Sequence, residues 1–475
     1  MKKEFKAHPL MILSYIKPFL LLLLIPVVRG SIQYIKNGEV TQILGLEIFV
    51  LALVILVGFL RWYFFRLTVT HDTIAIRDGV FIRRAAVIPV NLISSVQSEQ
   101  TPFDFIFKSV TFRINTEAGN LKTTDYSFKL SRNDAHALSD LLYGQKSGEP
   151  VRFSPIKIAI LAAATSSAFT GMLVGVPILK NAAKLAGMGI NELLDQINSV
   201  SGKFQTYFPP IVNTVSLVLL ASFIISFFYS FLRHINFRLF LNEDRIEVRS
   251  GFFVMLRTSF KKKSVNNVII EQTILMHLLK RYEMKVNVGG YGEAKSESQV
   301  LVPSGRYKEI KEMFSDYFPF LKPMGPQLKS NVGIVHENRY LFWAEIFFAL
   351  LLVTAIITAN LFGEFGNFII FMTAIIGCII FYYAYLCRWE YKNCALSFSE
   401  TVFVKGKKGL RRCRLYCPRD NVGDIKLIRF PPDSIFKTCN VKITVRSETA
   451  DNITVRHTDY EQTKEEIFRC YGITE

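Results

Sequence analysis

Basic side chains gather at three places in the chain, and the densest group places six of them within residues 405–414. Ammonium and guanidinium groups held close together bind phosphate and other anions. The residues with this potential are Arg83 and Arg84 in the first group, Arg257, Lys261, Lys262 and Lys263 in the second, and Lys407, Lys408, Arg411, Arg412 and Arg414 in the third. Two kinds of anion contact fit such groups. One is a pocket for a single lipid headgroup, and the other is a solvated face attracted to any anionic bilayer by about 1 kcal/mol per basic residue.

The cysteines offer a different chemistry, because thiolates and imidazoles bind zinc. All seven lie in the last third of the chain, and an odd number confined there does not form a disulfide framework. Cys413 and Cys417 are four residues apart, with Cys394, Cys439 and His457 in the same region. Zinc sites usually show two closely spaced pairs, so we favour reduced thiols in a cytosol and expect no metal or other cofactor.

Motifs of the common enzymes are missing from the sequence. It contains no Gly-rich phosphate loop ending in Lys-Ser or Lys-Thr, no His-Glu-x-x-His and no Gly-x-Ser-x-Gly. The seven histidines are scattered without the spacing of metal ligands. We therefore expect a protein that is not an enzyme.

Long apolar segments occur in three pairs along the chain. The first has nineteen residues, which at 1.5 Å each span about 28 Å, close to the roughly 30 Å of a hydrocarbon core. We predict six transmembrane helices: Leu10–Val28, Ile43–Leu60, Ile156–Leu179, Phe208–Phe231, Tyr340–Leu361 and Phe368–Leu386.

The third apolar segment carries a small residue at every fourth position. This row continues through Ala163, Ser167, Gly171 and Gly175, and on a helix these residues share one face. Small residues let a second helix approach closely, so the row predicts a helix-packing face. Small residues are also common in membrane helices without such a role.

The distribution of Lys and Arg predicts the orientation in the membrane. The loops that join the two helices of each pair hold only five of the 57 basic residues: Arg29, Lys36, Lys180, Lys184 and Lys203. Because basic loops stay in the cytoplasm, both termini and all segments between the pairs are expected there, in a multi-pass protein of the cytoplasmic membrane. The net charge of +18 suits an anionic inner leaflet, and tethering to a membrane argues against nucleic acid as the partner.

An internal repeat sets the organisation of the chain. Arg61, Gly79 and Glu99 recur 172 positions later as Arg233, Gly251 and Glu271, and a less similar third copy starts at Arg388. After each helix pair the hydrophobic period changes to two, with Asp78-Gly79 as a hairpin turn, and a helix closes each copy. We predict membrane hairpins at 10–60, 155–232 and 338–387 and α+β modules at 61–146, 233–320 and 388–475.

The segment Glu99-Gln100-Thr101-Pro102-Phe103-Asp104-Phe105-Ile106-Phe107-Lys108, with its second copy from Glu271, resembles bacterial pleckstrin-homology-like (YdbS-like PH) membrane domains. The whole chain is similar to membrane proteins of the YdbT type, which accompany smaller YdbS-type proteins in Gram-positive bacteria. The third copy departs from the pattern, with Arg429-Phe430-Pro431-Pro432 at this place. The resemblance implies modules with a seven-stranded barrel closed by a C-terminal helix, and it implies no catalytic residues.

The resemblance also implies a role. We expect a non-enzymatic membrane scaffold that assembles with a smaller YdbS-type protein or with itself, in tolerance of envelope stress or antimicrobial peptides. An anionic-lipid-binding protein is the alternative, since eukaryotic pleckstrin-homology domains hold inositol phosphates at the equivalent basic hairpin. A small-solute transporter or channel is a further alternative. Ionisable residues near the middle of a membrane mark substrate paths, and we expect Lys17, Glu47 and Glu345 to lie toward the membrane interfaces instead.

Overall fold

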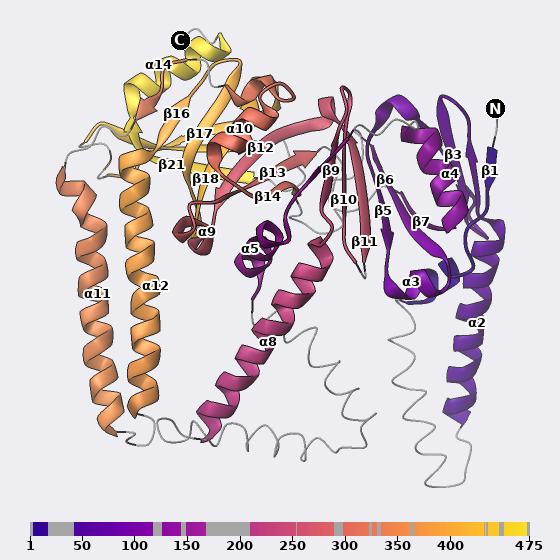
Figure 1. Ribbon diagram of the computed structural model, residues 1–475, viewed down its shortest axis with the longest axis horizontal. Coiled ribbons are helices and arrows are strands. Elements are labelled where there is room, and N and C mark those ends of the chain that lie inside the picture. The colour runs from indigo at the N-terminus through magenta and orange to yellow at the C-terminus, as the bar shows by residue number, and fades with distance from the viewer. Residues whose placement is uncertain are drawn as a thin grey trace. The chain divides into compact units, whose positions relative to one another are not determined.

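The computed structural model describes most of the chain, and its elements follow the labels of Figure 1. The described residues are 3–17, 42–116, 126–143, 149–167, 210–252, 254–288, 298–322, 325–329, 334–361, 363, 366–431, 433, 436–445 and 451–472. The chain divides into two compact units. The first contains Met1–Val151 and Arg238–Ser264, and the second contains Arg152–Phe237, Val265–Val288 and Ser298–Glu475.

The first unit contains an antiparallel four-stranded sheet in the order β1-β2-β3-β4. Its strands are β1 (Lys3–Phe5), β2 (Arg66–Val69), β3 (Thr73–Asp78) and β4 (Arg84–Pro89). Gly79 adopts a φ of +114° between β3 and β4, and an added Cβ would lie 2.0 Å from the carbonyl oxygen of Ile82. Only glycine fits this turn. Strand β1 lies before the first apolar segment, a position that the sequence analysis did not foresee.

A seven-stranded antiparallel sheet follows, in the order β7-β6-β5-β11-β10-β9-β8. Its strands are β5 (Ile93–Gln100), β6 (Ser109–Thr116), β7 (Tyr126–Ser131), β8 (Pro150–Arg152), β9 (Arg238–Leu241), β10 (Arg245–Ser250) and β11 (Met255–Lys261). The short helix α3 (Pro102–Ile106) joins β5 to β6, and α4 (Arg132–Tyr143) follows β7. Side chains from β1 to β7 and from α4 share one core, in which Leu67, Phe112 and Leu138 are completely buried.

The second unit has a seven-stranded sheet in the order β14-β13-β12-β18-β17-β16-β15 and a three-stranded sheet, β19-β20-β21. The strands of the larger sheet are β12 (Val265–Gln272), β13 (Tyr282–Val288), β14 (Gln299–Gly305), β15 (Leu328–Lys329), β16 (Ala395–Ser397), β17 (Thr401–Lys408) and β18 (Arg411–Pro418). The smaller sheet contains β19 (Val422–Ile428), β20 (Thr438–Val445) and β21 (Asp451–Asp459).

Three helices accompany these strands: α9 (Ile274–Leu278), α10 (Tyr307–Phe314) and α14 (Tyr460–Tyr471). Side chains of β16 to β21 and of α14 form one core, which includes Leu415, Val441 and Ile467. Both units therefore contain the mixed α+β architecture of antiparallel sheets that the sequence predicts.

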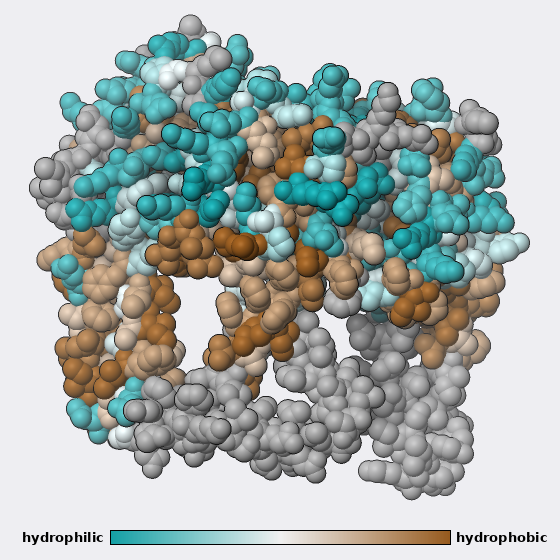
Figure 2. All heavy atoms as spheres, in the orientation of Figure 1, coloured by the Kyte–Doolittle hydropathy of each residue, from teal (hydrophilic) through white to brown (hydrophobic). Residues whose placement is uncertain are grey.

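The apolar helices extend away from the sheets (Figure 1). They are α2 (Gln42–Phe64), α5 (Pro155–Thr165), α8 (Pro210–His234), α11 (Ile334–Leu361) and α12 (Gly366–Asn393). Of the described residues, only Leu341–Leu361 and Gly366–Asn393 form helices long and apolar enough to cross a bilayer, compared with the six predicted. The exposed faces of α11 and α12 are hydrophobic (Figure 2). Gly377 lets the ring of Phe348 pack directly on the backbone of α12.

The helix predicted at Ile156–Leu179 ends early, because α5 stops at Thr165. The hydroxyls of Thr165 and Ser166 donate to backbone carbonyls one turn earlier, and such bonds compete with helix continuation. Ser167 instead donates its N–H to the hydroxyl of Ser226 at 3.2 Å. Ser167 therefore lies beyond the end of α5, while Ala163 lies on it. Gly171 and Gly175 lie outside the described residues, so the helix-packing face stays a prediction.

Candidate functional site

Strand pairing joins two groups of strands in each seven-stranded sheet, and we call these two places the junctions. In the first unit, β5 pairs antiparallel with β11, with Val96 opposite Ser259. In the second unit, β12 pairs antiparallel with β18, with Val268 opposite Tyr416. Each junction converts two sheet edges into the middle of a continuous sheet, so the backbone groups of all four strands are satisfied.

The first junction contains small buried polar side chains, with larger charged side chains near its ends. Ser95, Thr258 and Ser259 are buried at 3% exposure or less. Lys261 donates from Nζ to the backbone carbonyls of Val90 at 3.3 Å and Asn91 at 2.5 Å. Farther along β5, Glu99 forms an ion pair with Arg113 of β6, with 2.7 Å between Oε2 and Nη1.

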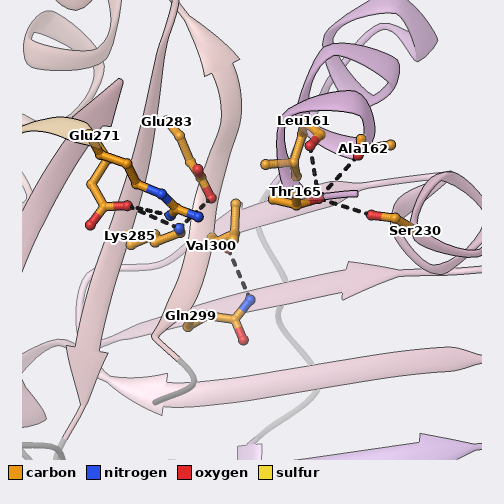
Figure 3. A network of polar contacts seen from close by, with 10 residues as sticks. Leu161, Ala162, Thr165, Ser230, Glu271, Glu283, Lys285, Gln299 and Val300 are labelled. Carbon is orange, nitrogen blue, oxygen red and sulfur yellow. Dashed lines mark hydrogen bonds and ion pairs between the residues drawn. The ribbon is translucent and has the colours of Figure 1, made fainter. Parts of the chain in front are cut away.

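The second junction contains a buried ion network (Figure 3). Glu271 on β12 accepts from Arg411 Nη1 on β18 at 2.9 Å and from Lys285 Nζ on β13 at 3.3 Å. Lys285 also lies 3.0 Å from Oε1 of Glu283, whose side chain is completely buried. Arg411 thus crosses the junction and joins two strands through side-chain charge in addition to backbone bonds.

The network shifts the pKa values of Glu271, Glu283 and Lys285. Burial raises the pKa of Glu283 above its usual value, and the neighbouring Lys285 only partly offsets this. Burial opposes ionisation of Glu271 as well, but Lys285 and Arg411 outweigh it and lower its pKa. The pKa of Lys285 is raised because Glu283 and Glu271 overcome the cost of burial. Two carboxylates and two cations therefore form one network, in which Glu283 is completely buried and Arg411 is partly exposed. Glu283 is the carboxylate that is costliest to ionise.

Most basic residues of the third group contact protein side chains. Lys407 is buried, with Nζ 3.0 Å from the thiol of Cys387 and 3.9 Å from the ring centre of Tyr383. Arg412 is buried too, and donates to the hydroxyl of Tyr385 at 2.9 Å while its guanidinium lies 4.5 Å from the ring centre of Trp389. These three aromatic residues belong to α12, so the third basic hairpin packs on the end of a candidate membrane helix.

The remaining members of this group differ in exposure. Arg414 lies 3.8 Å from the ring centre of Tyr307, whose hydroxyl is 2.7 Å from that of Tyr416. Lys408 is exposed. Only part of the third group therefore faces solvent in the way that a solvated anion-binding face requires.

The first and second groups are more accessible than the third. Arg83 and Arg84 are exposed, and Arg83 lies 5.8 Å from the ring centre of Phe64. Arg257 donates from Nε to Glu247 at 2.5 Å, while Lys263 is exposed and Lys262 is half-buried. Arg84 lies on β4, Arg257 and Lys261 lie on β11, and Lys262 and Lys263 lie in the turn Lys262–Ser264. The structure does not bring the three groups into one cluster within either unit.

The cysteines of the last third lie mainly in a hydrophobic core. Cys394, Cys413, Cys417 and Cys439 are buried among the core side chains of β16 to β21. Burial raises the pKa of Cys417 to about 12, which keeps the thiol protonated. No group of three His, Cys, Asp or Glu residues that could hold a metal ion occurs among the described residues.

Sequence reasoning missed the junctions and the ion network. Only β12 offers a partial signal, because Val268, Ile269 and Ile270 are consecutive apolar residues in place of alternation, whereas β5 is mainly polar in sequence. Strands covered on both faces show this pattern. Glu99 and Glu271 were recognised as repeat partners, but nothing in their spacing reveals that Arg411 joins the second one.

Comparison with known proteins agrees with this architecture. Small antiparallel sheets that enclose one core with a C-terminal helix are typical of pleckstrin-homology-like domains. The sequence matches the Bacterial PH domain family over residues 18–146 and 190–313, two segments that start 172 positions apart and together cover more than half of the chain. The chain belongs to the bacterial PH domain family. No curated protein and no solved structure gives a significant match.

Proposed function

We propose that this chain is a multi-pass protein of the bacterial cytoplasmic membrane and serves as a non-enzymatic scaffold. In this proposal it consists of three repeats, each with a membrane hairpin and a cytoplasmic PH-like module, and both termini are cytoplasmic. Membership of the bacterial PH domain family and the two helices of membrane-spanning length support it. The family suggests a module for lipid or protein interaction.

An unusual backbone conformation supports the three-repeat plan. Lys108, Lys280 and Lys437 have φ angles of +53°, +53° and +52°, at the start of the strands β6, β13 and β20. Non-glycine residues seldom adopt positive φ, so three equivalent lysines are unexpected without common ancestry. A short strand also precedes each apolar segment pair, as β1, β8 and β15. We infer that each hairpin is inserted after the first strand of its module.

The observation that carries the scaffold function is the continuity of the sheets through the junctions. Within each unit, strands from two repeats joined in one sheet form a single rigid body, whereas modules on flexible linkers move independently. A rigid body of this kind presents a fixed surface to other proteins at the membrane. The third basic group adds weight, because Lys407, Arg411 and Arg412 serve contacts within the protein and do not line an open headgroup pocket.

We further propose that the partner is a smaller membrane protein with a PH-like module of the YdbS type, acting with this chain in tolerance of envelope stress or antimicrobial peptides. Affinity purification of the tagged full chain in mild detergent tests this. A stoichiometric small membrane protein with a PH-like module is the expected result. A tightly co-purifying solute without such a protein, or solute flux in proteoliposomes, would contradict the proposal and favour transport.

Attraction to anionic lipid is the second candidate function. Arg83, Arg84, Lys263 and Lys408 are exposed, and each could add about 1 kcal/mol of attraction to an anionic leaflet. Replacing all four with Gln in the full chain and measuring the anionic lipid that co-purifies per protein tests this role. Unchanged lipid content would leave the scaffold as the sole function supported by the structure.

A further inference from the structure

Two strands, β4 and β19, end their sheets with one edge open. Strand β4 is the last of the sheet β1-β2-β3-β4, and β19 is the first of the sheet β19-β20-β21. Among the described residues, no strand pairs with the outer edge of either. Val87 on β4 is 64% exposed, and Gly423, Asp424 and Lys426 on β19 are exposed. Open edges of this kind attract further strands.

The two junctions show which strands pair with edges of this kind. In the proposed repeat, β4 is equivalent to β11 and β18, and β19 is equivalent to β5 and β12. Each junction pairs one strand of the first kind with one of the second, and both pairings are antiparallel. β4 in the first repeat and β19 in the third are therefore one edge of each kind, and neither has a partner strand there among the described residues.

We propose that β19 of one copy of this chain pairs antiparallel with β4 of a second copy. The inference rests on the proposed three-repeat function. Transferring the register of the first junction places Asp424 opposite Ile88, Ile425 opposite Val87 and Ile428 opposite Arg84. A head-to-tail contact of this type links copies into a ring or an open filament.

The side chains fit this pairing. In the first junction, the core residue Val96 lies opposite Ser259, and the side chain of Ser259 points to the face of the sheet opposite to that of the adjacent buried Phe260. Ile425 and Val87 repeat this relation, because Ile425 packs on its own core while Val87 points away from the core that holds Ile88. Directly opposite residues in antiparallel strands contact each other, so Ile425 would cover the exposed Val87.

Backbone chemistry and charge also permit the contact. Pro89 cannot donate a backbone hydrogen bond, but it lies beyond the paired stretch, as the equivalent Pro418 lies beyond the paired part of β18. Asp424 and Lys426 neutralise each other at 3.2 Å on β19. In the transferred register Lys426 lies opposite Ala86, and like charges face each other only at the last pair, Arg83 opposite Arg429.

Cysteine cross-linking of the full chain in native membranes tests the register. One tagged copy carries Val87→Cys and a differently tagged copy carries Ile425→Cys, with a short bismaleimide as the cross-linker. The expected result is a dimer with both tags when the two variants are co-expressed, and its loss when either is expressed alone. Leu141→Cys is the matched control, because Leu141 is exposed on α4 in the same unit as Val87. This variant should give no dimer with Ile425→Cys. Equal cross-linking of the Leu141→Cys and Val87→Cys variants, or none of either, would overturn the proposal.

The oligomeric state gives a second measurement that does not depend on cross-linking chemistry. Light scattering of the purified full chain in detergent should show assemblies larger than a monomer, which Val87→Glu reduces to monomers. Val87→Thr keeps the branched shape and Leu141→Glu adds the same charge elsewhere, so both should keep the assemblies. A wild-type monomer overturns self-pairing. If Val87→Cys cross-links to a different protein with a PH-like module, self-pairing is overturned but the scaffold function is supported. If neither Val87→Cys nor Ile425→Cys captures any protein, the result counts against self-pairing and against the scaffold function.

Discussion

The two junctions share one backbone arrangement but differ in the side chains that support it. Both contain an acidic residue on the central strand and a basic residue on the next strand, Glu99 with Arg113 in the first and Glu271 with Lys285 in the second. The second adds the buried Glu283, where the first has Thr111, and adds Arg411 from the joining strand. The pairing geometry therefore does not depend on charge, and the ion network is an additional feature of the second junction.

The difference predicts that the second junction depends more strongly on single side chains. A buried charge that loses its partner destabilises a protein by more than the pair had stabilised it. In the first junction the Glu99 side chain is 23% exposed and can be solvated, while Glu271 is 7% exposed and Glu283 is completely buried. The following variants test this contrast in the full chain.

The largest effect is expected for Lys285→Met, which leaves Glu271 with Arg411 alone and Glu283 with no cation beside it. Removal of one partner from a buried ion network costs about 3–5 kcal/mol. The matched variant in the first junction, Arg113→Met, should cost clearly less because water reaches Glu99. Denaturant unfolding of both variants in detergent measures the difference. Equal losses would show that the two junctions do not differ in this respect.

A smaller loss is expected for Arg411→Met, because Lys285 still neutralises Glu271 and the Arg411 side chain is 39% exposed. We expect about 1–2 kcal/mol, in the range for one charged hydrogen bond. Native-state hydrogen exchange of peptides from β12 and β18 should show faster exchange at both strands. Lys261→Met in the first junction removes only bonds to backbone carbonyls and should change exchange in β5 and β11 less.

The pair of phenols offers a third, weaker test of the second junction. Tyr416→Phe removes the hydroxyl bond to Tyr307, and burial raises the pKa of Tyr416, so the hydroxyl is neutral at every physiological pH. The expected loss is about 1 kcal/mol, typical of one neutral hydrogen bond. Thermal unfolding measures it. No loss would show that water replaces the bond without cost.

The smallest effect concerns pH, and it belongs to Glu283. Its pKa in the folded protein is raised above the ordinary 4.5, so the folded state binds more protons than the unfolded state as pH rises above that value. Glu283 therefore favours folding at low pH, and this contribution is lost as pH rises through the folded pKa. Glu283→Gln should remove this part of the pH dependence, measured as the free energy of unfolding from pH 4.5 to 8. An identical slope in both proteins would contradict the assignment.

Local chemistry allowed much of the fold to be predicted from the sequence. The Asp78-Gly79 turn requires positive φ, and the helix from Ser131 begins with a hydroxyl that accepts from the N–H of Asp134 at 3.2 Å. The long apolar stretches predict α11 and α12, because apolar runs of this length are typical of helices that span a membrane. Hydroxyl groups at Thr165 and Ser166 end α5 early, and apolar content alone does not reveal this.

The junctions could not be predicted in the same way. Periodicity identifies a strand but not its neighbour, because an edge of backbone N–H and C=O groups accepts many partners. The partners of Glu271 lie 14 and 140 residues away, and only the fold brings Arg411 to it. The sequence shows where basic residues are dense, yet the aromatic contacts of Lys407 and Arg412 depend on how α12 meets the sheet.

The place of β1 affects how the protein is made. Lys3–Phe5 pairs with Leu67–Val69, and Trp62 donates from its indole to the carbonyl of Ala7 at 2.8 Å, so both ends of the first apolar hairpin meet in one sheet. During synthesis the N-terminal strand must wait until about sixty more residues have left the ribosome. In the proposed three-repeat topology, the first apolar segments therefore enter the bilayer before this sheet is completed.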